Sequence, residues 1–173
     1  MNRRRDRRLL GVLLTAALVL FGGAWLARID PTHAPQAPTR GDELRQRFDA
    51  AVLLLHSKQY EPAAAALQRV LELAPRLTEA HVNMGFALLG LQRPAAARAA
   101  FDAAIGLKAD QANAYYGLAM AHEGLGDLEL AIGAMRSYLH LARAEDEAHL
   151  RRARAALWEW ETKLAGQRAA KRP

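Results

Sequence analysis

The sequence lacks several residue types on which common functional sites depend. It contains no cysteine, so disulfide bonds, thiolate nucleophiles and thiolate metal sites are excluded. No two of its six histidines stand four residues apart, and no glycine-rich phosphate loop or nucleophile elbow is present. We therefore predict that the chain is not an enzyme and holds no metal and no cofactor.

Aromatic residues are also scarce, at 6% of the chain, although 51% of the residues are apolar. Much of this apolar content is alanine, a strong helix former, and no stretch shows the alternating pattern of a β-strand. The composition therefore predicts an all-α protein of closely packed helices.

The net charge of +6 is concentrated at the two ends of the chain. Residues 1–30 carry +4 and residues 148–173 carry +5, so the 117 residues between them carry −3. Nucleic-acid binding requires a basic face on the folded surface. Because the middle of the chain is mildly acidic, we predict no nucleic-acid partner.

Residues 9–27 form an apolar run without a charge, and the basic segment before it, residues 1–8, has five arginines. A helix over this run covers about 28 Å, close to the ~30 Å hydrocarbon core of a bilayer. The positive-inside rule keeps the arginines in the cytoplasm and sends the rest of the chain across the membrane. We therefore predict a single-pass transmembrane anchor. A cleaved signal peptide is the alternative, and it would leave the same domain soluble.

The arginine and alanine content indicates where such a membrane would be. Twenty arginines against four lysines are typical of a GC-rich bacterial genome. The membrane is then a bacterial inner membrane, and the domain beyond the anchor lies in the periplasm. Residues 28–43 are predicted to be a linker, because Pro31, Pro35 and Pro38 favour extended chain.

From residue 44 onward the sequence repeats every 34 residues, in units at 44–77, 78–111 and 112–145. Small and large apolar residues recur at the same places of the units: Ala51, Gly85 and Ala119; Ala63, Ala97 and Ala131; Leu67, Phe101 and Met135. This pattern resembles the tetratricopeptide repeat family, whose unit is a helix-turn-helix pair. The resemblance implies a short right-handed solenoid of three repeats, with the small residues where two helices approach closely and the large ones between units.

Residues 146–165 are predicted to be a capping helix that closes the array. Leu150, Ala153, Leu157, Trp160 and Leu164 form one apolar stripe along it, and its other face is polar. A solenoid needs such a helix to end its stack of repeats in water. The last residues, 166–173, are predicted to be a frayed basic tail.

The resemblance also implies a peptide-binding groove on the concave side, along the first helix of each unit. The candidate groove residues are Phe48, Val52, Leu55, Val82, Asn83, Phe86, Leu89, Tyr116 and Met120. Most of them are apolar, so an apolar stretch of a partner fits better than the acidic tails bound by family members with a carboxylate clamp. Arg151 and Arg154 of the capping helix are candidates to meet a partner's C-terminal carboxylate, and otherwise they are solvated.

Two functions are consistent with these features. The first is a membrane-anchored scaffold or assembly factor that binds an apolar or C-terminal peptide of another protein, a layout similar to that of the tetratricopeptide factors of cytochrome c maturation and nitrite reductase assembly. The second is an accessory structural subunit of a membrane complex. Coverage of the apolar groove residues by the chain's own linker, or by a second copy in a homodimer, is the alternative to a partner peptide. The sequence does not identify the partner or the pathway.

Overall fold

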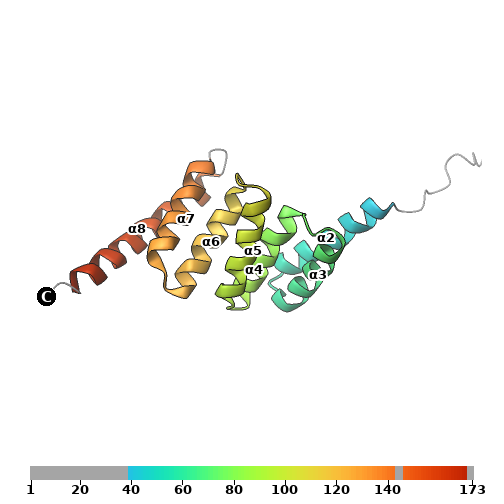
Figure 1. Cartoon of the computed structure of the whole chain (residues 1–173), viewed down its shortest axis with the longest axis horizontal. Coiled ribbons are helices and arrows are strands. Elements are labelled where there is room, and N and C mark those ends of the chain that lie inside the picture. The colour runs from blue at the N-terminus through green and yellow to red at the C-terminus, as the bar shows by residue number, and fades with distance from the viewer. Residues whose placement is uncertain (1–38, 143–145, 171–173) are drawn as a thin grey trace, which may run out of the picture. The chain divides into compact units, whose positions relative to one another are not determined.

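The computed structural model describes residues 39–142 and 146–170, which form seven helices and no strand. The helices are α2 (Arg40–His56), α3 (Tyr60–Leu73), α4 (Thr78–Gly90), α5 (Pro94–Leu107), α6 (Ala112–Leu125), α7 (Leu128–Leu141) and α8 (Glu147–Ala170). They follow one another in chain order, each beside the next (Figure 1). The all-α prediction is confirmed for the described residues.

The helices form three pairs, α2 with α3, α4 with α5, and α6 with α7, and α8 then packs against α7. The first helices of neighbouring pairs also touch, α2 with α4 and α4 with α6. These first helices therefore share one layer, and a groove along that layer is bounded by corresponding positions of successive repeats.

The same turn joins the two helices of each pair. Lys58, Gln92 and Gly126 stand 34 residues apart, and each has a positive φ, of 58°, 58° and 83°. In the third turn the amide of Asp127 donates to the carbonyl of His122 at 2.9 Å, and the other two turns contain the equivalent bond. Such a left-handed residue satisfies the last carbonyls of the first helix and reverses the chain. Only the third turn has glycine, the residue that adopts this conformation without a steric cost.

The core between the second and third repeats is built around Phe101, which is fully buried. Its ring lies against Gly85 of α4 and Gly117 of α6. A Cβ atom added at Gly85 would come within 2.5 Å of the ring, and one at Gly117 would come closer still. The predicted close approach at Gly85 is confirmed, as is the burial of Phe101, Leu67 and Met135. The role of Gly117 was not predicted.

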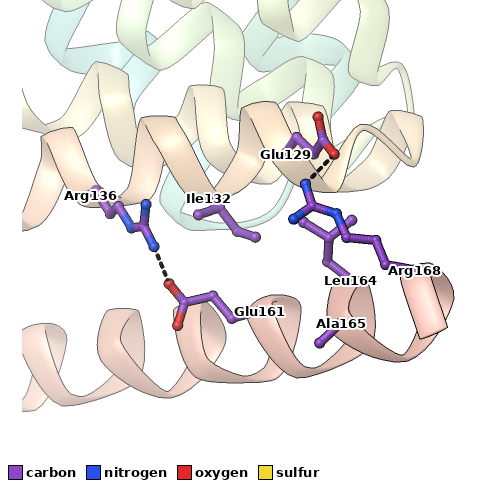
Figure 2. Close-up of a pocket in the computed structure, with 7 residues that line it drawn as sticks. All are labelled: Glu129, Ile132, Arg136, Glu161, Leu164, Ala165 and Arg168. Carbon is purple, nitrogen blue, oxygen red and sulfur yellow. Dashed lines mark hydrogen bonds and ion pairs between the residues drawn. The ribbon is translucent and has the colours of Figure 1, made fainter.

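Helix α8 is held on α7 mainly by its apolar stripe, in which Leu150, Ala153 and Trp160 are buried. Two ion pairs also join the helices. Arg136 contacts Glu161, and Arg168 contacts Glu129, each at 2.6 Å. Figure 2 shows Ile132 between these two pairs; Ile132 and Leu164 line a cavity of about 340 Å³ between the helices. Exposed ion pairs contribute only about 0–1 kcal/mol each, so burial of the stripe dominates.

Two predicted boundaries are wrong by a few residues. Helix α2 begins at Arg40, so residues 40–43 are helical and do not belong to the linker. No proline follows Pro38 in this segment. Asp42 and Glu43 in the first turn stabilise the start of the helix, because the helix dipole is positive at that end. Helix α8 continues to Ala170, so residues 166–170 of the predicted tail are helical, since Arg168 is bound to α7.

Within the described residues, no helix combines the length and the apolar character needed to cross a membrane. The predicted basic segment, residues 1–8, the predicted anchor, residues 9–27, and the linker up to residue 38 lie outside the described residues. The anchor therefore stays a prediction from the sequence.

Candidate binding groove

Two cavities lie along the first-helix layer, and they share the side chains of Phe86 and Tyr116. The first, here called the central cavity, has a volume of about 470 Å³ and lies between α4 and α6. It is lined by Phe86, Leu89, Gln92, Pro94, Tyr116, Met120, Glu123 and Gly124. The second, here called the α8 cavity, also measures about 470 Å³. It is lined by Phe86, Asn113, Tyr116, Tyr138, His149 and Arg152. The two cavities are neighbours, because Phe86 and Tyr116 line both, and together they are here called the groove from α4 to α8.

The repeat period places the walls of the central cavity. Phe86 of α4 and Met120 of α6 occupy the same place in successive units, as do Leu89 and Glu123. The helices lie side by side, so equal places in the two units face the same groove. A periodic sequence therefore produces a continuous apolar surface from separate segments.

The aromatic walls of the groove are supported by buried rings. Phe86 makes an edge contact with Phe101, with ring centroids 5.1 Å apart and an interplanar angle of 72°. Tyr116 makes a similar contact with Tyr138 of α7, at 5.2 Å and 62°. Phe101 and Tyr138 are buried, so they fix the positions of the two rings that the cavities share. The groove is thus shaped by the core beneath it.

The two ends of the groove carry opposite charges. Among the described residues that line the central cavity only Glu123 has a carboxylate and none has a cationic group, whereas Arg152 and His149 line the α8 cavity. In the described part of the chain Arg152 makes no ion pair and no hydrogen bond. His149 lies 3.4 Å from Asp146, so any charge it carries is partly offset. The α8 cavity is therefore suited to an anionic group at Arg152.

Four of the predicted groove residues come together in the central cavity: Phe86, Leu89, Tyr116 and Met120. The candidates in the first repeat lie outside both cavities, with Phe48 and Leu55 packed on the core of that repeat and Val52 half-buried. Asn83 is half-buried and also lies outside both cavities. Those parts of the predicted groove stay predictions.

The prediction that Val82 faces the groove is wrong, because its side chain is only 5% exposed and packs with Phe101. Tyr116 holds the same place in the next unit, but its longer side chain reaches the groove. The predicted arginines also lie outside the cavities. Arg154 is bound to Glu147 at 2.8 Å, and Arg151 is exposed.

Arg152 could have been found from the sequence. If the 34-residue register is extended past residue 145, Arg152 falls on the place that Met84 and Leu118 hold in the preceding units. Those two side chains are half-buried in the core. A charged residue at a core place of the last unit marks the point where the array opens to solvent. Neither cavity includes a metal site, and no group of metal-ligating side chains occurs within residues 39–142 and 146–170.

These observations define a helix-pair repeat array with an aromatic groove on its first helices, and comparison with known sequences identifies the repeat. Residues 78–111 and 112–145 each match the profile of the tetratricopeptide repeat family. The chain therefore contains tetratricopeptide repeats, as the resemblance predicted. No curated protein matches this sequence significantly.

Several solved structures share this fold at low sequence identity. The type III secretion translocator chaperone SycD of Yersinia enterocolitica is 16% identical, with a TM-score of 0.69 over 73% of this chain and 89% of SycD. PcrH of Pseudomonas aeruginosa, in complex with the chaperone-binding region of PopD, is 20% identical, with a TM-score of 0.67 over 74% of this chain and 98% of PcrH. The first repeat domain of Spaghetti (RPAP3), bound to an HSP90 peptide, is 19% identical, with a TM-score of 0.65 over 74% and 98% of the two chains. At these identities the likeness shows the fold alone.

Proposed function

We propose that this chain is a binding protein that holds an extended, mainly apolar segment of a partner protein in the groove from α4 to α8. The observation that carries the proposal is that the two cavities adjoin, with Phe86 and Tyr116 lining both of them. Each cavity has a volume in the range of small-molecule and peptide side-chain pockets, about 300–1,000 Å³. Aromatic and thioether side chains at such a surface are typical of sites that bind other polypeptides.

The composition of the groove favours a peptide over a metabolite. The central cavity offers Phe86, Leu89, Tyr116 and Met120 but only one charged group, Glu123. An apolar side chain of a peptide gains free energy there by leaving water, at about 25 cal/mol for each Å² buried. The fold is compatible with this function, since PcrH and RPAP3 have been solved with polypeptide segments bound.

The proposal includes the location of the protein. An uncharged run over residues 9–27 after five arginines supports a membrane anchor, with the repeats on the periplasmic side. There the chain would act as a scaffold or assembly factor for a partner protein. Fusion of a reporter that is active only in the periplasm to the C-terminus tests this placement. An inactive reporter on a stable fusion would contradict it.

Substitution of Met120 by arginine tests the groove. The longer arginine side chain fills the central cavity. Because its guanidinium group has to remain solvated, an apolar side chain of a peptide can no longer be buried there. We expect M120R to lower the affinity for apolar peptides by at least about tenfold, since a burial loss of ~1.4 kcal/mol has that effect. Binding to an array of synthetic peptides is measured by fluorescence.

The matched control is Leu130→Arg. Leu130 is an exposed leucine of α7 and lies outside both cavities, so the same charge is added without blocking the groove. Circular dichroism establishes that both variants are folded. Equal affinities of M120R and L130R for the peptides would refute the groove as the binding site.

A further inference from the structure

We infer that the α8 cavity binds the C-terminal residue of the partner segment, with its carboxylate at Arg152 and its apolar side chain among the rings of Phe86, Tyr116 and Tyr138. This inference rests on the proposed function, and it adds the chemistry that the groove selects and the direction in which the peptide lies.

The pairing of the arginines of α8 singles out Arg152. Arg154 is bound to Glu147, and Arg168 near the end of the helix is bound to Glu129. Arg152 lines the cavity and makes no ion pair within the described residues. A guanidinium group presents a fork of N–H donors that fits a carboxylate. Of the acidic residues that the structure describes near the start of α8, Glu147 is bound to Arg154 and Asp146 lies against His149, so neither is paired with Arg152.

The remaining lining of the α8 cavity favours the same ligand. Asn113 is the second residue of α6, and its side-chain amide can donate a further hydrogen bond to a carboxylate. The cavity also lies beside the first turns of α6 and α8, where the partial charge of a helix is positive. Both features add to the attraction between the guanidinium group of Arg152 and a carboxylate.

The size and the aromatic walls of the α8 cavity indicate a terminal residue instead of an acidic side chain. At about 470 Å³ the cavity is much larger than a carboxylate, and three rings line it. An aspartate or glutamate side chain would bring a carboxylate but no apolar group to fill the space between those rings. A C-terminal residue carries the carboxylate and an apolar side chain on one Cα atom. It therefore matches the cation and the rings together.

The charge at the other end of the groove gives the peptide a direction. Asn113 and Glu123 are ten residues apart on α6, which corresponds to about 15 Å. An extended peptide covers that distance with roughly four or five residues. The C-terminal residue then lies at Arg152, and the residue four or five places before it lies near Glu123, where a basic side chain is favoured.

The test compares peptides that differ only in the C-terminal group. The full-length protein is bound to an array of seven-residue synthetic peptides, each made with a free carboxylate and as the amide. We expect peptides that end in an aromatic or aliphatic residue to bind about tenfold more tightly with the free carboxylate, as for a hydrogen-bonded ion pair. Arg152→Gln removes this difference. Arg151→Gln, an exposed arginine one residue earlier that lies outside the cavity, preserves it.

The outcomes separate this inference from the proposed function. Equal binding of acids and amides that still depends on Met120 overturns the C-terminal site and leaves the groove intact. Tight binding of amidated peptides with an internal aspartate or glutamate, lost in R152Q, assigns the anion to a side chain and also overturns it. If no peptide of either series binds, both the inference and the proposed function fail.

Discussion

Replacement of Gly117 by alanine tests the packing on which the groove is built. A Cβ atom at this position would overlap the ring of Phe101, which is fully buried. Overpacking of this kind costs about 2–3 kcal/mol, the upper part of the usual range. Alanine recovers about 1 kcal/mol through its higher helix propensity. We therefore expect a net loss of about 1–2 kcal/mol and a fall in Tm of roughly 3–10 °C.

Gly133→Ala is the control for this prediction. Gly133 lies in the middle of α7, and nothing lies within 4 Å of a Cβ atom added there. This variant gains the helix propensity without a clash, so it should be more stable by up to about 1 kcal/mol. Urea denaturation followed by circular dichroism gives the free energy of unfolding of each variant.

A double-mutant cycle identifies the cause of the loss at Gly117. In a Phe101→Leu background the ring is absent, so Gly117→Ala should be much less harmful there. The packing argument is refuted if G117A is neutral or stabilising in the native background. It is also refuted if the loss is the same with leucine at position 101.

Two further predictions concern the capping helix and the turns. Trp160→Ala should lower the free energy of unfolding by about 3–5 kcal/mol, because the side chain of Trp160 is only 5% exposed. Trp158 is 70% exposed, so Trp158→Ala should change it by less than about 0.5 kcal/mol. Equal urea midpoints of the two variants would contradict the packing of α8. Lys58→Gly should stabilise the chain by about 1 kcal/mol and Gly126→Ala should destabilise it similarly, since both residues have positive φ. Differential scanning calorimetry measures both, and a destabilised K58G would be inconsistent with the left-handed turn.

The repeat architecture could be predicted because one physical pattern recurs three times. Gly85, Phe101 and Ala119 hold small and large places that only a close-packed helix pair explains, and they are buried as expected. The helix ends were harder to predict. Gly166 is a residue that commonly ends a helix, yet α8 continues to Ala170, and in its last turns Arg168 contacts Glu129, 39 residues away.

The candidate site was predicted only in part, because the exposure of a side chain depends on its length and on its neighbours. Val82 and Tyr116 share a repeat place, yet the first is covered and the second lines the groove. Arg152 was missed because the repeat register was not continued into the last helix. Gln92 in the turn after α4 and Pro94 at the start of α5 also line the central cavity, and a pattern based on the first helices alone does not include them.

The position of α8 at the end of the array affects how the groove opens. Helix α6 packs against α4, α5 and α7, whereas the extensive packing of α8 is with α7 alone. Detachment of α8 therefore breaks one helix interface, and unfolding of α6 breaks three. In an array stabilised by nearest neighbours, amide hydrogens of α8 should exchange with solvent before those of α6. A ligand that bridges Tyr116 and Arg152 would slow exchange in α8 most, so the last helix would report occupancy of the groove.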